Sequence, residues 1–208
     1  MAKVVHTFFV QSLRQVWPAC LIVLGVFAAG VIIGTMGVDR LNPEQATELS
    51  SYLDRFVQQA GSLEIETGKT TGALLNDAGM ILAVYVLGLT VIGIPVVLGL
   101  VFCRGFVLGF AVDFLTRGKG LQGLVLVLAG VLPQNLLLLP ALLIGGIVSL
   151  SFSVLLARRF YDSGIAVWPG FVWYSSLMLL AAVVAACAGA VEVYLTPVLI
   201  RAAARNFF

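Results

Sequence analysis

The feature that most constrains this chain is a run from Gly120 to Ala157 that contains no charged side chain. As a helix, the run would be about 57 Å long at 1.5 Å per residue, nearly twice the roughly 30 Å thickness of a bilayer's hydrocarbon core. A second uncharged run extends from Gln15 to Val38. Soluble domains contain about 25% charged residues, whereas this chain has 11% charged and 61% hydrophobic residues. The sequence therefore predicts an all-α, polytopic integral membrane bundle.

Other classes of protein do not fit this composition. An outer-membrane barrel would show alternating segments of about ten residues, and no such alternation is present. The high apolar content excludes a disordered chain, and the net charge of +2 gives no reason to expect a nucleic acid partner. The first apolar run is too long for a cleavable signal peptide, so we expect it to remain as an anchor.

The limits of the first, second and last crossings are clearer in the sequence than those of the central segments. Gly93 and Pro95 are expected to bend the second crossing. A single membrane domain is expected over residues 1–208, with an interfacial helix at 2–15, a first crossing at 16–38, a second at 78–103 and a last one at 171–195.

The centre of the chain permits two arrangements. In one, residues 105–132 form two half-helices of a re-entrant hairpin, and 134–157 is the next full crossing, which gives four crossings. In the other there are six crossings, and Arg104 is buried or snorkels to the interface. Pro133 and Pro140 should break or kink the long uncharged run in either case.

Charge is unevenly distributed along the chain. The loop 39–77 holds seven of the ten acidic residues but three of the twelve basic ones. The positive-inside rule therefore predicts that this loop is extracytoplasmic and that both termini are cytoplasmic, which requires an even number of crossings. Arg158 and Arg159 would then lie outside, against the same rule.

The outer loop contains one predicted amphipathic helix, at residues 42–61. Asn42 is a good N-cap, Pro43 suits the first helical position, and Glu44 favours the positive end of the helix dipole. The apolar face packs either on the protein's own bundle and lipid or on a partner protein. Candidate partner-binding residues on this face are Leu49, Tyr52, Leu53, Phe56 and Val57.

Polar and helix-distorting residues inside the apolar segments are candidate functional residues, because charge at membrane depth is costly. Asp113 and Arg117 are spaced as a pair on one helix face. Gln134 and Asn135 either satisfy backbone groups freed at Pro133 or contribute to a ligand site or conduit. The intramembrane motif comprises Gly93, Pro95, Arg104, Gly105, Gly109, Asp113, Pro133, Gln134, Asn135 and Pro140.

No catalytic constellation is visible in the sequence. His6 is the single histidine, and no cluster has metal-ligand spacing and no motif suggests a cofactor. We therefore expect a non-enzymatic protein without a cofactor. Rows of small residues let helix backbones approach closely, either within the chain or in a homodimer. Candidates for such packing are Gly30, Gly34, Ala182, Ala186 and Ala190, with a second row at Ala181, Ala185 and Gly189.

Three stretches, in order, resemble the stage II sporulation protein M family. They are Gly88-Leu-Thr-Val-Ile-Gly-Ile-Pro95, Arg104-Gly-Phe-Val-Leu-Gly-Phe110 and Gly130-Val-Leu-Pro-Gln-Asn-Leu-Leu-Leu-Leu-Pro-Ala141. The Leu-Pro-Gln-Asn-Leu block with its second proline is the most specific. The loop stretch Ser51-Tyr-Leu-Asp-Arg-Phe-Val-Gln-Gln59 is also similar, and the resemblance covers about residues 10–200.

The resemblance implies a role in engulfment during endospore formation. In that family the membrane protein works with two extracytoplasmic cell-wall hydrolases, an amidase/endopeptidase and a lytic transglycosylase. It would act as a membrane scaffold in the mother-cell and septal membrane, with membrane lipid as its surroundings. The alternative from the residues alone is a small oligomeric transporter or channel-like protein that uses broken helices near Pro133 and Pro140.

Overall fold

The computed structural model describes residues 2–60, 79–161 and 167–207. Side-chain surroundings are described for these ranges except residues 2–16, 52–60, 119, 160, 161, 197, 201 and 203–207. The described chain is helical, without strands. Its elements are α1 (Ala2–Val38), α2 (Pro43–Ala60), α4 (Gly93–Leu126), a π-helical turn η1 (Val127–Val131), α5 (Leu132–Tyr161) and α6 (Trp168–Phe207), with a short apolar helix Gly79–Gly88 before α4.

Four described stretches are long and apolar enough to cross a membrane. They are Trp17–Val38, Gly93–Gly118, Gly120–Arg159 and Trp168–Ile200. This confirms the prediction of an all-α polytopic membrane bundle. Many large apolar side chains of these helices are exposed, as lipid-facing residues would be.

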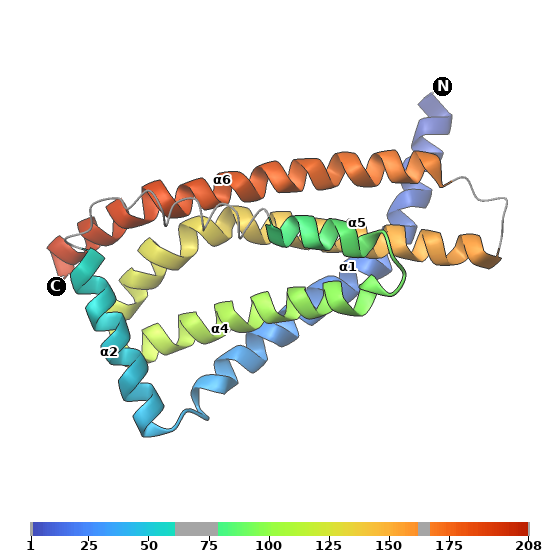
Figure 1. The fold of residues 1–208 in the computed structure, drawn as a ribbon. Helices are drawn as coiled ribbons and strands as arrows, with labels where there is room; N and C mark the ends of the chain where they lie inside the picture. The colour runs from blue at the N-terminus through green and yellow to red at the C-terminus, as the bar shows by residue number, and fades with distance from the viewer. Residues whose placement is uncertain (1, 61–78, 162–166, 208) are drawn as a thin grey trace.

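The helices pack in two pairs, α1 with α4 and α5 with α6 (Figure 1). α1 and α4 run in parallel, because Gly30 lies at Phe102 and Gly37 lies further along at Phe110. α5 and α6 are antiparallel, since Gly170 lies at Leu155 while Gly130 lies at Ile200. The main apolar core, which includes Val23, Val84, Val101, Leu138 and Ala185, fills the space between the pairs.

Two glycine pairs hold α1 and α4 together. A Cβ atom at Gly30 or Gly34 would strike the carbonyl oxygen of Phe102 or Phe106. On the other helix, a Cβ atom at Gly105 would lie 2.5 Å from the Phe27 carbonyl oxygen. Two GxxxG rows therefore face each other, which permits close backbone contact. Gly30 and Gly34 therefore pack against another helix of the same chain, which is one of the two packing roles predicted for them.

The predicted second crossing over 78–103 is not a single helix. The chain leaves the helix Gly79–Gly88, turns over residues 89–92 and starts α4 at Gly93. The Thr90 hydroxyl accepts a hydrogen bond from the Gly93 backbone N–H over 3.1 Å, and a Cβ atom at Gly93 would collide with the Leu87 backbone. Gly93 thus marks a reversal between two helices instead of a bend within one.

The short helix Gly79–Gly88 is fastened to α5 and α6 by buried hydroxyls. Ser149 donates to the Val84 carbonyl over 3.3 Å, and Ser153 donates to Gly88 over 2.8 Å and to Thr90 over 3.1 Å. The residue numbers of the partners increase in the same direction on both segments, from Ser149 with Val84 to Ser153 with Gly88. The short helix therefore runs parallel to α5 and antiparallel to α4. At about 1.5 Å per residue it is roughly 15 Å long, half of a hydrocarbon core.

The first arrangement predicted for the centre agrees with the structure in its four crossings but not in the shape of residues 105–132. α4 is one helix through Arg104 to Gly118, so 105–132 is not a pair of half-helices in a hairpin. The break comes at Gly120, whose φ of 55° is a backbone conformation that glycine adopts without strain. Pro140 lies inside the continuous helix α5, which extends beyond the predicted 134–157. Pro133 is the second residue of α5, just after the π-helical turn, where the hydrogen-bond ladder is already irregular.

The two termini lie at opposite ends of the bundle (Figure 1). This differs from the expectation of both termini on one side, because the short helix Gly79–Gly88 lets α4 start at the same end as α1. α1, α4 and α6 run one way and α5 runs the other way. Arg158 and Arg159 therefore lie at the end where α1 begins, whereas Arg117 of α4 and Arg201 and Arg205 of α6 lie at the opposite end, so basic residues occur at both ends.

Three exposed tryptophans lie at or near the starts of two apolar spans, at one end of the bundle. Trp17 belongs to α1, and Trp168 and Trp173 belong to α6. Tryptophan side chains favour the membrane interface, so this end carries an aromatic belt. The predicted helix 2–15 is not separate, because α1 is continuous from Ala2 and contains Pro18. The N-terminal part of α1 nevertheless turns away from the rest (Figure 1).

One of the two predicted rows of small residues on α6 faces the core. Ala181, Ala185 and Gly189 are buried. The row Ala182, Ala186 and Ala190 is half-buried. The antiparallel contact with α5 selects the buried row, which the periodicity of the sequence alone did not distinguish from the other.

Candidate functional site

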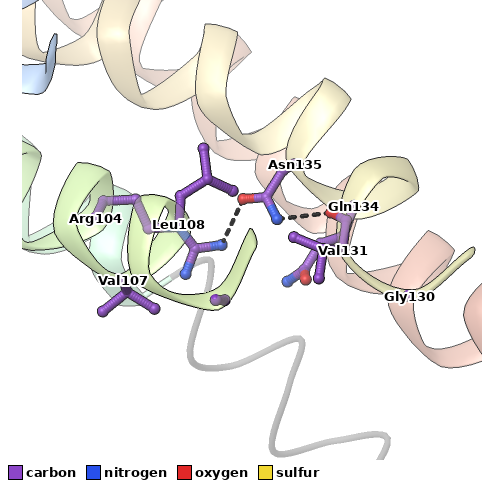
Figure 2. Close-up of a pocket in the computed structure, with 8 residues that line it drawn as sticks. Arg104, Val107, Leu108, Gly130, Val131, Gln134 and Asn135 are labelled. Atoms are coloured by element: carbon purple, nitrogen blue, oxygen red, sulfur yellow. Dashed lines mark hydrogen bonds between the residues drawn. The ribbon is translucent and has the colours of Figure 1, made fainter. Parts of the chain in front are cut away.

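A charged side chain lies inside the membrane-spanning part of α4. Arg104 is near the middle of the 26-residue span Gly93–Gly118. Its Nη2 atom donates a hydrogen bond to Oδ1 of Asn135 on α5 over 3.3 Å (Figure 2). No carboxylate of the described residues forms an ion pair with Arg104. An arginine at this depth is costly unless its donors are satisfied, so its surroundings are the first candidate site.

Asn135 joins Arg104 to the irregular part of the backbone. The Asn135 side chain is 9% exposed, and its Nδ2 atom donates to the Val131 carbonyl over 2.7 Å. Val131 is the last residue of the π-helical turn, and π turns occur frequently at functional sites. The predicted backbone-satisfying role of the amides is therefore combined in Asn135 with a second role, fixing the orientation of Arg104.

The neighbouring amide points to a third helix. Gln134 donates from Nε2 to Oε2 of Glu192 on α6 over 2.7 Å. Together the four side chains form a polar layer across α4, α5 and α6. The sequence alone did not pair Gln134 with Glu192. Their side-by-side position depends on the antiparallel register of α5 and α6, which leaves no signal in a single sequence.

A cavity of about 200 Å³ opens beside this layer, between α4 and the start of α5. Its polar lining is Arg104, Gln134 and Asn135, and its remaining lining residues are Val107, Leu108, Ala111, Gly130 and Val131 (Figure 2). The cavity thus combines one guanidinium with apolar walls. This combination suits an anionic group better than a cation. Within the described residues, no group of three His, Cys, Asp or Glu side chains is placed to hold a metal.

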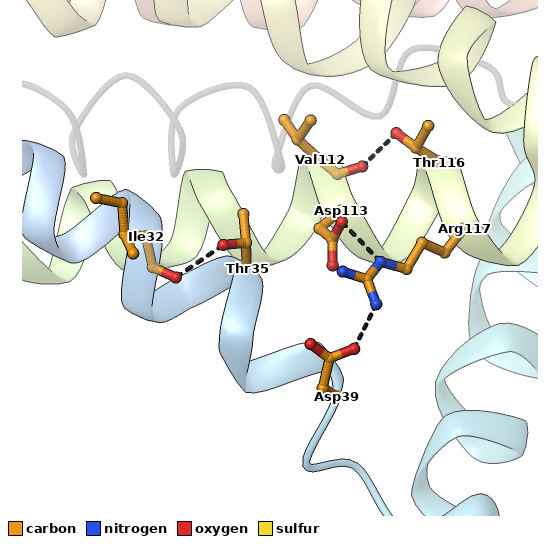
Figure 3. A network of polar contacts seen from close by, with 7 residues as sticks. All are labelled: Ile32, Thr35, Asp39, Val112, Asp113, Thr116 and Arg117. Carbon is orange, nitrogen blue, oxygen red and sulfur yellow. Dashed lines mark hydrogen bonds and ion pairs between the residues drawn. The ribbon is translucent and has the colours of Figure 1, made fainter.

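A second polar cluster closes the opposite end of α4 from the tryptophan belt. Arg117 donates from Nε to Oδ1 of Asp113 over 2.9 Å, and it also pairs with Asp39 at the end of α1 (Figure 3). Asp113 is largely covered, with 18% of its side chain exposed, while Arg117 and Asp39 are more than half exposed. The predicted pair of Asp113 and Arg117 therefore extends to a third residue, which ties the end of α1 to α4.

Comparison with known proteins supports the sequence resemblance. The family model described as stage II sporulation protein M matches residues 23–197. The chain belongs to the stage II sporulation protein M family. No curated protein and no solved structure shows significant similarity to the chain. The stage II sporulation protein M family comprises membrane proteins involved in sporulation, which are generally non-enzymatic.

The stretches that carry the resemblance to the stage II sporulation protein M family lie at three structural points. Residues 88–95 form the turn before α4, where Pro95 occupies the first turn of the helix. Residues 104–110 contribute Arg104 to the cavity, and Gly105 and Gly109 to the contact with α1. Residues 130–141 contain the cavity lining from Gly130 to Asn135, with Pro140 exposed further along α5.

The outer helix of this family member is α2, Pro43–Ala60, close to the predicted range 42–61. Asn42 is its cap residue, and the Asn42 backbone N–H donates to Oε1 of Gln45 over 3.3 Å. α2 leads away from the Asp39 end of α1 toward the C-terminal end of α6 (Figure 1). Leu49 is half-buried. The side chains of Tyr52, Leu53, Phe56 and Val57 lie outside the described part of the structure.

Proposed function

We propose that the protein is a non-enzymatic membrane scaffold of the sporulation engulfment machinery, with α2 as its docking element. The observation that carries the proposal is the position of α2, a polar helix across one end of an otherwise apolar bundle. Its base is next to Asp39, which is paired with Arg117 of α4. A rigid base would present the helix in a defined orientation to a partner.

The proposed orientation rests on the family resemblance, because basic residues lie at both ends of the bundle. Arg158 and Arg159 lie at the end where α1 begins, together with the tryptophan belt, whereas Arg117, Arg201 and Arg205 lie at the other end, where α2 carries exposed Glu44 and Glu48. We propose that the first end is cytoplasmic and that α2 is extracytoplasmic, where cell-wall enzymes act. On that side α2 would meet the cell-wall hydrolases that the resemblance implies, an amidase/endopeptidase and a lytic transglycosylase. The proposed location is the mother-cell and septal membrane.

Crosslinking and co-purification from sporulating cells test this function. The full-length tagged protein is extracted in mild detergent, and the recovered partners are identified by mass spectrometry. Tyr52→Asp and Phe56→Asp should abolish recovery of both hydrolases while the protein remains in the membrane. Ser51→Asp is the matched control, because Ser51 is exposed and bonds only the Glu48 carbonyl of its own helix. Normal recovery with both apolar-face variants would rule out α2 as the docking element.

A channel-like function has weaker support. It requires helices broken near Pro133 and Pro140, but α5 continues through Pro140. The observation in its favour is the cavity at Arg104, which lies at membrane depth. Flux of ions or small solutes through the reconstituted protein would support this function, and flux that persists in Arg104→Gln would show that the cavity is not the path.

A further inference from the structure

The cavity at Arg104 offers hydrogen-bond donors that the described protein does not use. A guanidinium has five N–H donors, and the described contact of Arg104 is one bond of 3.3 Å to the neutral amide oxygen of Asn135. That bond fixes the group in orientation without neutralising its charge. An uncompensated cation at mid-span in α4 draws in an anion, because the local dielectric constant is low.

The acidic side chain of the polar layer does not line the cavity. Glu192 accepts a hydrogen bond from Gln134 on the α6 side of α5, and it is not among the residues that line the cavity. Asn135 donates its own N–H to the Val131 carbonyl, so its amide is held in place from both ends. The cavity therefore keeps a cationic character at Arg104.

The cavity is also open toward the lipid-facing surface. Val107, in its wall, is 57% exposed. On the adjoining segment of α5 and η1, the apolar side chains Leu128, Leu132 and Leu136 are exposed at successive helical turns. A ligand with a charged head and hydrocarbon chains could place the head at Arg104 and the chains along this row. A small soluble anion would contact Arg104 but not this lipid-facing row.

The depth of the site limits which anionic headgroups can bind at Arg104. Arg104 is about 16 Å from Gly93 and about 21 Å from Gly118 along the helix at 1.5 Å per residue. For a fatty-acid carboxylate at this depth two effects oppose each other, because burial raises the pKa of a carboxyl group and an adjacent guanidinium lowers it. A phosphodiester remains ionised, and its two free oxygens match the fork of a guanidinium.

We propose that the cavity between α4 and α5 binds the phosphodiester of a membrane phospholipid, with Arg104 as its main contact. Asn135 positions Arg104, and the exposed row Leu128, Leu132 and Leu136 carries the acyl chains. The π-helical turn contributes the glycine wall at Gly130 and the Val131 carbonyl that holds Asn135. This site does not depend on the scaffold function proposed for α2.

Thermal unfolding of the full-length protein in detergent micelles tests the site, because a ligand of the folded state raises the apparent Tm. The probe is phosphatidylglycerol at increasing mole fraction. One comparison uses diacylglycerol with the same acyl chains, which lacks the phosphate, and another uses inorganic phosphate, which lacks the chains. We expect phosphatidylglycerol alone to produce a saturable rise in Tm.

The variants identify the contact. Arg104→Gln should require at least about tenfold more phosphatidylglycerol for the same rise in Tm. A hydrogen bond to a charged group contributes a free energy that corresponds to a tenfold or larger change in affinity. The amount of phosphatidylglycerol that Arg104→Lys requires should lie between the amounts for the wild type and for Arg104→Gln. Lysine keeps the positive charge but lacks the paired donors of the guanidinium. Arg158→Gln, an exposed arginine at the end of α5, is the matched control and should behave as the wild type.

Three results would overturn the proposal. They are an equal rise with diacylglycerol, an equal rise with inorganic phosphate, which would indicate a site for soluble anions, and an unchanged response in Arg104→Gln. If Arg104→Gln does not fold, native mass spectrometry of the wild type decides the matter. One phosphatidylglycerol retained in preference to diacylglycerol supports the site, and equal retention of the two lipids excludes it.

Discussion

Arg104 of α4 and Asn135 of α5 meet within the membrane-spanning part of the bundle, with Nη2 of the arginine 3.3 Å from Oδ1 of the asparagine. They lie at similar distances along the chain from the break at Gly120, so the α4–α5 hairpin brings them to the same depth. Because Asn135 also bonds the carbonyl that ends the π-helical turn, the pair connects a buried charge to an irregular backbone.

Asn135→Ala should destabilise the protein by about 1–3 kcal/mol, because it leaves the Val131 carbonyl and Arg104 without their side-chain partner. Reversible unfolding of the purified protein in mixed micelles measures the loss. The control is Leu121→Ala, at an exposed side chain beside the break at Gly120. An Asn135→Ala protein as stable as the wild type would show that the amide does not support the turn.

Gly34→Ala should destabilise the bundle by about 1–3 kcal/mol, a typical cost of overpacking. Its Cβ atom would collide with the backbone of Phe106, which cannot move away as a flexible side chain would. Gly25→Ala lies on the same helix with nothing within 4 Å of the added atom, and it should be neutral or slightly stabilising. Equal stabilities of the two variants would contradict the glycine-mediated contact of α1 and α4.

Ser153→Ala should loosen the short helix Gly79–Gly88 at a cost of about 1–3 kcal/mol, because the buried carbonyl of Gly88 and the partly buried carbonyl of Thr90 lose their donor. Ser151→Ala is the matched control, since Ser151 bonds the Ile147 carbonyl of its own helix. Hydrogen exchange of the backbone amides of residues 81–88 measures the local effect. Faster exchange in both variants alike would argue against a specific fastening by Ser153.

The direction of the helices predicts that Arg158 and Ala202 lie on opposite sides of the membrane. Single cysteines at these positions are introduced after Cys20, Cys103 and Cys187 are changed to serine. A membrane-impermeant thiol reagent applied to intact protoplasts should label Ala202→Cys and Ser51→Cys, and should label Arg158→Cys only after permeabilisation. Labelling of Ala202→Cys and Arg158→Cys under the same condition would contradict the arrangement of α4 and α6.

The position of the short helix explains why the topology was not predicted correctly. Residues 78–103 have the length and apolarity of one crossing, and hydropathy does not register a reversal inside such a stretch. The reversal depends on the Thr90 hydroxyl at Gly93 and on Ser149 and Ser153 from a segment far along the chain. Those distant donors satisfy the carbonyls at the end of the short helix, which the bilayer itself cannot do.

The sequence by itself determined the all-helical membrane class and the family, because long uncharged apolar runs permit little else in a bilayer and the motif stretches are specific. It also placed α2 and identified Arg104, Gln134 and Asn135 as unusual, since polar groups at membrane depth are costly. Only the tertiary structure decided that Gly30 and Gly34 meet Gly105 and Gly109, that Gln134 meets Glu192, and that a cavity opens at Arg104. These relationships depend on the register and direction of helices that are remote in sequence, and a helix period alone does not specify which faces will meet.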